Sequence, residues 1–155
     1  MGVLPNAPFT GILSGSLDKK GRVCIPAQFR HILAGQSPNS VYLRKSLLTP
    51  VLEAFGASVM QRFHEAQSES DPFFMGSHDT AAFALLALSQ ELAIDETGRV
   101  RIPDEFIAHA GLAESVTFVG IGRRFEIWDA ARFQPVLRER TAAAIEQQQR
   151  QAERS

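Results

Sequence analysis

The sequence predicts an α+β fold in which one strand–turn–strand–helix unit occurs twice, because a thirteen-residue segment of the first half recurs in the second. The segments are 17–29 and 94–106, and seven of their thirteen positions are identical. These are Asp18/Asp95, Gly21/Gly98, Arg22/Arg99, Val23/Val100, Ile25/Ile102, Pro26/Pro103 and Phe29/Phe106. Such a repeat sets the architecture of the chain. Each half of the 155 residues is near the limit of about 80 residues for an independent core, so we expect the halves to share one core or to be tied into an oligomer.

The first copy begins with a predicted strand over residues 9–17, which is rich in β-forming residues and punctuated by glycine. A turn over 18–21 follows, because Asp favours the start of a turn and Gly accepts a positive φ at its end. Residues 22–25 alternate polar and apolar side chains, as a half-buried strand does, and we expect the two strands to form a hairpin. Pro26 suits the first position of a helix, Gly35 can close that helix, and residues 41–43 form another short strand.

The second copy repeats this order. Strands over 89–94 and 99–102 flank a turn at 95–98, and a short helix runs from Pro103 to Gly111. Strands over 116–119 and 125–128 come next. Asp129 is placed to cap the last helix, in which Pro135 should produce a kink or a delayed start. Beyond Ile145 the chain has no apolar stripe, and we expect it to fray.

Residues 50–63 admit two interpretations. Leu52, Phe55, Val59 and Phe63 have helical spacing, whereas alignment with residues 125–128 predicts a strand at 52–55 followed by a helix. We prefer the second interpretation, because repeats keep their architecture. Asp79 should cap a helix that leads into the second copy. The predicted organisation is a first repeat at 9–67, a linker at 68–80, a second repeat at 81–140 and a polar C-terminal tail at 141–155.

The net charge is −1, yet charge is distributed unevenly along the chain. Residues 16–45 carry six basic side chains and one acidic side chain, whereas residues 46–95 carry one basic and seven acidic side chains. The distribution of charge decides where a polyanion binds more than the sum does. A basic first copy therefore favours a nucleic-acid partner there, with chance clustering on solvated faces as the alternative.

The repeated Asp-x-x-x-Arg pattern is the candidate functional site. Each arginine follows a turn at the start of a strand, where a planar guanidinium can reach a base edge or a phosphate. Each aspartate could orient its arginine across the turn, and each glycine lets the backbone turn sharply. The alternative is a salt-bridged hairpin that the fold needs twice. The residues are Asp18, Gly21 and Arg22 in the first copy and Asp95, Gly98 and Arg99 in the second.

Further basic side chains could supply phosphate contacts, which give affinity without sequence information. For each of them a solvated surface charge is the alternative, and we expect Arg30 to be ordinary surface. At the second turn, Glu96 would repel a phosphate where Lys19 of the first turn attracts one. We therefore hypothesise that the first copy dominates DNA contact and the second is chiefly architectural. The candidates are Lys19, Lys20, Arg44 and Lys45 in the first half and Arg101, Arg123 and Arg124 in the second.

Residues 11–26 follow the pattern Gly-x-x-x-x-x-Leu-Asp-x-Lys-Gly-Arg-(apolar)-x-(apolar)-Pro. Together with the recurring site and the stretch 119–128, this pattern resembles the MraZ family of bacterial transcriptional regulators over about residues 9–140. The resemblance implies an AbrB-like swapped-hairpin β-barrel, formed within one chain by the two repeats, with short flanking helices. The second turn departs from the family pattern, since it carries Glu96-Thr97 where the first carries Lys19-Lys20.

The resemblance also implies partners. Ring-shaped homo-oligomers are expected, as is binding to double-stranded DNA at short direct repeats. These repeats would lie upstream of the division and cell-wall gene cluster, so that the regulator acts on its own promoter. An oligomeric structural or protein-interaction scaffold with the same fold and no specific operator is the alternative. Salt dependence separates the two, because phosphate-driven binding falls steeply with salt.

Other function classes find little support in the sequence. His64-Glu65 lacks the second histidine of a zinc helix, residues 120–125 lack the third glycine of a dinucleotide motif, and the four histidines are scattered. We expect no catalytic residues, no metal site, no cofactor and no small-molecule substrate. The single cysteine, Cys24, fits a reducing compartment, and we expect it to be a small buried hydrophobe. With neither a leader nor a membrane span predicted, we expect a cytoplasmic, nucleoid-associated protein.

Overall fold

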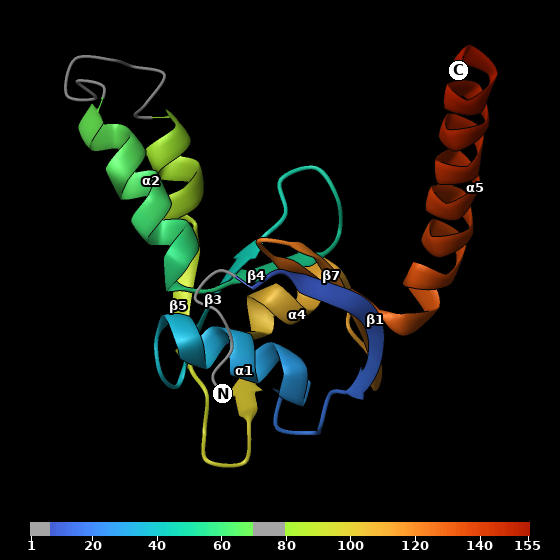
Figure 1. Ribbon diagram of the computed structural model, residues 1–155. Helices are drawn as coiled ribbons and strands as arrows, with labels where there is room; N and C mark the ends of the chain where they lie inside the picture. The colour runs from blue at the N-terminus through green and yellow to red at the C-terminus, as the bar shows by residue number, and fades with distance from the viewer. Residues whose placement is uncertain (1–6, 70–79) are drawn as a thin grey trace.

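The computed structural model describes residues 7–69 and 80–155, whose elements follow the repeated order expected from the sequence (Figure 1). The first half contains β1 (Phe9–Ser16), β2 (Arg22–Cys24), α1 (Ala27–Gln36), β3 (Ser40–Lys45), β4 (Leu52–Phe55) and α2 (Ala57–Glu69). The second half contains η2 (Phe83–Ala87), β5 (Ser89–Ala93), β6 (Arg99–Arg101), α4 (Asp104–Ala110), β7 (Ser115–Gly122), β8 (Phe125–Asp129) and α5 (Ala130–Arg154).

The ambiguous region 50–63 is a strand followed by a helix, which confirms the interpretation drawn from the repeat. β4 pairs with β8, the strand to which it was aligned, and α2 begins two residues after β4 ends. Residues 80–82 are helical and lead into η2. Asp79, expected to cap this helix, and residues 70–79 of the predicted linker lie outside the described residues.

Six of the strands form one antiparallel sheet with the order β1-β7-β8-β4-β3-β5. The α+β class is confirmed, but the predicted barrel is wrong, because among the described strands β1 pairs with β7 alone and β5 with β3 alone. A barrel requires every strand to pair on both sides, so β1 and β5 are edges of an open sheet.

The two shortest strands, β2 and β6, form a separate antiparallel ribbon that joins the two copies. The expected hairpin between residues 9–17 and 22–25 is therefore wrong. β1 pairs with β7 over eight residues, and only a single bridge, between Leu17 and Val23, joins the two segments of the predicted hairpin. Each copy thus pairs its short strand with that of the other copy. This pairing places the central valines of the ribbon, Val23 and Val100, opposite each other and buries both. Burying each valine side chain contributes about 1.5–3 kcal/mol to this pairing.

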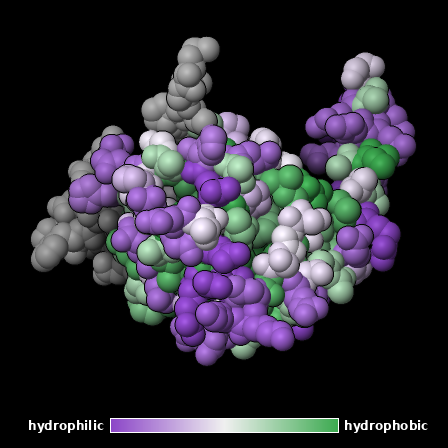
Figure 2. All heavy atoms as spheres, turned by 90° about the horizontal axis from the view of Figure 1, so that it is seen from below, coloured by the Kyte–Doolittle hydropathy of each residue, from purple (hydrophilic) through white to green (hydrophobic). Residues whose placement is uncertain are grey.

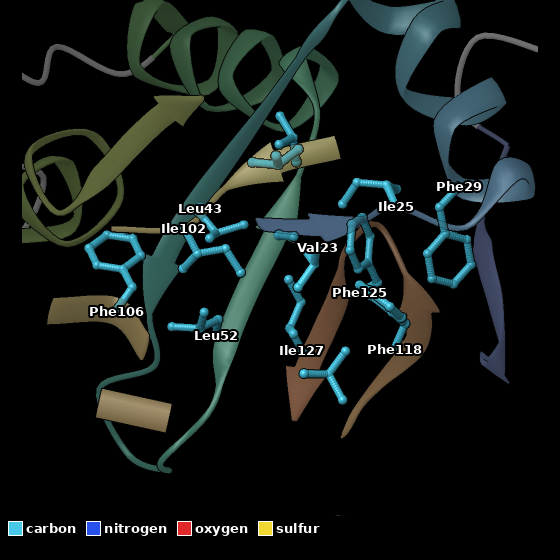
Figure 3. Packing of buried hydrophobic residues seen from close by; sticks show 14 of the residues in the cluster. Val23, Ile25, Phe29, Leu43, Leu52, Ile102, Phe106, Phe118, Phe125 and Ile127 are labelled. Atoms are coloured by element: carbon cyan, nitrogen blue, oxygen red, sulfur yellow. The ribbon is translucent and has the colours of Figure 1, made fainter. Parts of the chain in front are cut away.

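The hydrophobic core lies between the ribbon, the open sheet and the short helices. Phe29 of α1 packs its ring 4.7 Å from that of Phe125 and 5.3 Å from that of Phe9, measured between centroids. Figure 3 shows Val23 and Ile25 of the first copy directed into this cluster beside Phe125. Burying a phenylalanine side chain contributes about 2–3 kcal/mol, so the core holds the inner face of the ribbon firmly in place.

The helix ends agree only in part with expectation. Gly111 ends α4 with φ +59°, and the Asp129 side chain caps α5 by accepting a hydrogen bond from the N–H of Arg132 at 3.3 Å. Gly35, by contrast, lies inside α1, which continues to Gln36.

The last helix is longer than expected. α5 begins at Ala130, so Pro135 lies inside it without delaying its start, and it continues to Arg154 rather than fraying beyond Ile145. Its composition explains the difference, because Ala, Gln, Glu and Arg are strong helix formers even without an apolar stripe. Figure 1 shows α5 extending away from the sheet with the C-terminus at its far tip. Within the described residues, none of the helices combines the length and apolar character that a membrane crossing requires.

Candidate nucleic-acid interface

The Asp18 side chain closes the first turn. Its Oδ1 accepts hydrogen bonds from the backbone N–H groups of Lys20 and Arg22, both at 2.9 Å, and its Oδ2 accepts one from Arg22 Nε at 2.8 Å. Gly21 has a φ of +80°, which glycine adopts without the strain that a Cβ would bring. The same carboxylate therefore closes the turn and orients the arginine that follows it.

The second turn repeats the backbone hydrogen bonds of the first, but its side chains are bonded differently. Asp95 Oδ1 accepts hydrogen bonds from the N–H groups of Thr97 and Arg99, both at 2.9 Å, and from the Thr97 hydroxyl at 2.7 Å. Gly98 has a φ of +83°. No hydrogen bond or ion pair joins the Arg99 side chain to another described residue. The expected side-chain contact between the paired aspartate and arginine therefore occurs in the first copy and not in the second.

Both turn carboxyls are held in the charged form. The Arg22 N–H is the main cause of a pKa for Asp18 below its ordinary value of 3.8, and the Arg22 side chain adds to it. The pKa of Asp95 is also lowered, first by the Arg99 N–H and then by the Thr97 hydroxyl. Hydrogen bonds to the ionised form lower a carboxyl pKa, so both turns keep their closing charge at neutral pH.

The ribbon presents three arginines on one face. Because side chains alternate along a strand, residues 22, 24, 99 and 101 share the outer face while the central valines point into the core. The register pairs Arg22 with Arg101, Val23 with Val100 and Cys24 with Arg99. A two-stranded β-ribbon is one of the elements that the major groove of B-DNA admits, and three guanidinium groups on its face match the phosphates and guanine edges found there.

Cys24 is exposed, so its predicted burial is wrong. The alternation of β2 turns Val23 and Ile25 inward and Cys24 outward. The strand pattern thus overrides the apolar character of the thiol and places Cys24 on the arginine face.

Two exposed lysines extend the basic surface onto the first turn. Lys19 and Lys20 stand at its tip, where the second turn has the exposed pair Glu96 and Thr97. Both turns project from the lower side of the molecule in Figure 1, and Figure 2 shows hydrophilic residues gathered over much of that side. The first turn therefore carries the stronger attraction for a polyanion.

Arg44 and Arg124 are held together through one carboxylate in the six-stranded sheet. Glu53, almost buried on β4, pairs with Arg44 Nε at 3.3 Å and with Arg124 Nε at 2.9 Å. Arg44 Nη1 also donates to the Ala84 carbonyl at 3.0 Å. Neither arginine belongs to the ribbon, and their proposed contact with DNA stays a prediction.

Lys45 has a partner within the chain as well. Its Nζ lies 3.6 Å from Glu105 Oε2 and 5.6 Å from the centroid of the Phe106 ring. Arg123 is exposed in the turn between β7 and β8. The DNA contacts expected for these two residues remain untested, and both lie outside the ribbon.

Comparisons with known proteins show the family of this chain. A family model described as "MraZ protein, putative antitoxin-like" matches residues 85–155. A protein of Xanthobacter autotrophicus named "Transcriptional regulator MraZ" is 38% identical over 141 residues, which cover 91% of this chain and 89% of the relative. The chain belongs to the MraZ family. Relatives with the same name in Azorhizobium caulinodans and Rhodospirillum rubrum are 37% and 34% identical, and they align with 84% and 79% of this chain and 83% and 79% of their own length.

One residue of this MraZ-family chain lies at the site although the sequence predicted ordinary surface. Arg30, on α1, reaches across to the second turn, and its guanidinium lies against Gly98. Its Nε donates to the Ile25 carbonyl at 2.9 Å. The signal in the sequence was weak, because the glycine that Arg30 covers belongs to the other copy.

Among the described residues of this MraZ-family chain, no three His, Cys, Asp or Glu side chains gather closely enough to hold a metal ion. The ribbon face carries guanidinium groups and the first turn carries ammonium groups. Such a surface recognises anions through charge-assisted hydrogen bonds.

Proposed function

We propose that this chain is a sequence-specific transcriptional regulator that binds double-stranded DNA through the outer face of the β2–β6 ribbon and the two turns. The observation that carries the proposal is the three arginines that two different repeats bring to one ribbon face. The shared name of the relatives, transcriptional regulator, supports the same role.

The residues divide into two kinds of contact. Arg22, Arg99 and Arg101 are positioned for base edges, where a bidentate arginine–guanine pair discriminates by about 1–3 kcal/mol. Lys19 and Lys20 are positioned for phosphates, which fix the register of the protein on the duplex. Asp18 orients Arg22, so the first copy carries the larger share of recognition.

We further infer that the exchange of β2 and β6 is the swapped hairpin of AbrB-like domains, built here from repeats at 9–67 and 81–140. A ring-shaped homo-oligomer is part of the proposal. Its support is a set of exposed large apolar side chains, a kind of surface that marks protein contacts. Leu47 and Leu88 line one groove, which shows that the two segments carrying these side chains adjoin. The residues are Leu47, Leu48, Phe83, Leu86 and Leu88.

The proposed operator is a set of short direct repeats upstream of the division and cell-wall gene cluster, including the chain's own promoter, with the protein in the cytoplasm at the nucleoid. A ring reconciles a net charge of −1 with DNA binding, because several protomers on tandem repeats gain avidity through effective concentration. Binding should collapse when the operator is cut to one repeat, and undiminished affinity for a single repeat would contradict the ring.

A gel shift tests the proposal. Fragments from the promoter region of the chain's own genomic neighbourhood are titrated with protein against a scrambled competitor, and the titration is repeated between 50 and 200 mM salt. A specific complex whose affinity falls steeply with salt supports the regulator. If the chain retards no fragment more than the competitor, it is the scaffold without an operator.

A further inference from the structure

We infer that Arg30 is a phosphate-contacting residue at the second turn, so that the first copy supplies a basic group to both turns. The inference rests on the proposed DNA-binding function and deepens it. It replaces the expectation that Arg30 is ordinary surface, and it assigns the second turn a DNA contact beyond Arg99.

The geometry places the Arg30 guanidinium on the backbone of the second turn. A Cβ added at Gly98 would lie 2.7 Å from the Cζ, Nε and Nη1 atoms of Arg30, so the guanidinium packs directly against the backbone of the turn. The hydrogen bond from Nε to the Ile25 carbonyl fixes the side chain. A guanidinium has five N–H groups, and this is the only one that binds another described residue.

The equivalent place in the first turn is apolar. Arg30 and Ile107 each follow the shared proline of their copy by four positions. Ile107 Cδ1 lies 3.4 Å from the position of a Cβ at Gly21, so each turn glycine is covered by a side chain from the other copy. An isoleucine meets the packing need at this place, and the guanidinium at the second turn therefore adds a charge that packing does not require.

The charge balance of the second turn shows what this guanidinium does. Asp95 and Glu96 lie there with Arg99, whereas the equivalent positions of the first turn hold Asp18, two lysines and Arg22. Arg30 lines a shallow groove of about 220 Å³ together with both acids, and neither acid forms an ion pair with it. Its charge thus offsets that of Glu96, and its Nη groups remain for an oxygen anion. The partner that fits is a backbone phosphate of the duplex held by the ribbon.

Salt dependence measures this contact. Each phosphate contact makes the slope of log affinity against log salt steeper by about 0.9. Between 50 and 200 mM salt, a variant that lacks one contact should therefore lose ~3.5-fold less affinity than the wild-type chain. We expect Arg30→Met, which keeps the stem and loses the charge, to weaken binding of the promoter fragment and of random-sequence duplex alike. Its slope should be smaller than that of the wild-type chain by about 0.9.

Three further variants separate charge from packing. Arg30→Gln keeps a donor for the Ile25 carbonyl without the charge, so it should show the same loss of slope if Arg30→Met fails to fold. Arg30→Lys keeps the charge and should retain most of the slope. Arg132→Met is the matched control, because the Arg132 guanidinium lies against Gly111 in the same manner, in the first turn of α5 rather than at the ribbon. Its slope should equal that of the wild-type chain.

The outcomes are distinct. Wild-type slope and affinity in folded Arg30→Met or Arg30→Gln overturn the inference, as does a lower thermal midpoint with an unchanged slope, which would make Arg30 a structural brace only. If Arg22→Ala abolishes binding while these variants bind normally, the proposed function stands and the inference alone fails. If the wild-type chain binds neither the promoter fragment nor random duplex, both the proposed function and the inference about Arg30 are wrong.

Discussion

Arg22 and Arg101 face each other across the β2–β6 ribbon although they come from different copies of the repeat, and within the described part of the chain only Arg22 of the two is paired with an acid. Like charges placed directly opposite in an antiparallel pair are destabilising. The ribbon therefore carries uncompensated positive charge at one end, and a polyanion would relieve the repulsion. This is the physical reason to expect the surface to bind DNA more tightly than the net charge of −1 suggests.

Arg22→Ala should weaken operator binding more than Arg99→Ala. Asp18 pre-orients the Arg22 guanidinium through the bond to Nε, whereas Asp95 bonds only the backbone of Arg99. A pre-oriented bidentate contact is worth about 1–3 kcal/mol, so we expect a loss of roughly 5- to 160-fold for Arg22→Ala. Gel-shift titration of both variants at one salt concentration measures the difference. An equal or larger loss for Arg99→Ala would show that the second copy is not chiefly architectural.

Bound DNA should protect Cys24 from thiol reagents. Cys24 is exposed on the arginine face, opposite Arg99, and it is the only cysteine of the chain, so labelling reports one position. We expect a maleimide to react more slowly with the complex than with free protein, and the bulky adduct to impair binding. Cys24→Ser should bind DNA normally, because the hydroxyl has similar size. Equal labelling rates with and without DNA would place the interface elsewhere.

Glu53→Gln should destabilise the fold by about 2 kcal/mol, because it leaves the half-buried Arg44 and the more exposed Arg124 without their shared carboxylate. The midpoint of urea unfolding measures the loss. Glu146→Gln is the control, since Glu146 pairs with Arg150 on the exposed face of α5, where such a pair is worth about 0.5 kcal/mol or less. Similar losses in both variants would mean that the Glu53 cluster contributes no more than a surface pair.

Acid should weaken the native state through the two turns. Asp18 and Asp95 have folded pKa values below 3.8, so their stabilising effect is complete above that value and is lost as the pH falls through the folded pKa. The double variant Asp18→Asn/Asp95→Asn keeps acceptor oxygens but cannot titrate. We expect its thermal midpoint to depend less on pH below about pH 4 than that of the wild-type chain. Identical pH profiles would show that these carboxyls do not contribute to the acid transition.

The order of elements could be predicted from the sequence because the signals are local. Glycine, proline and alternation mark turns, helix starts and strands within a few residues, and the strand at 52–55 followed from the repeat. Strand partners could not be predicted in the same way. The pairing of β1 with β7 and of β2 with β6 joins residues from opposite halves, and its gain comes from shared burial rather than from local pattern.

The repeated motif of the candidate site could be predicted from the sequence, but the full set of residues at the site could not. Asp18, Gly21 and Arg22 lie as their spacing predicts. The apolar character of cysteine predicts burial for Cys24, whereas the alternation of β2 turns its side chain outward. The position of Arg30 cannot be predicted from local pattern, because its contact with Gly98 exists only once the two copies are folded together.

The exchange of short strands has a consequence for how the binding face responds to dilution. Because β2 and β6 lie on one polypeptide, the ribbon assembles in a unimolecular reaction. Tethered partners meet at effective concentrations of about millimolar, whereas a ribbon built from two separate chains would dissociate below its dimerisation constant. The arginine face of this protein therefore exists at any cellular abundance. Because the two turns beside this face are encoded separately, their sequences can also differ. The lysine at position 19 and the glutamate at position 96 are such a difference.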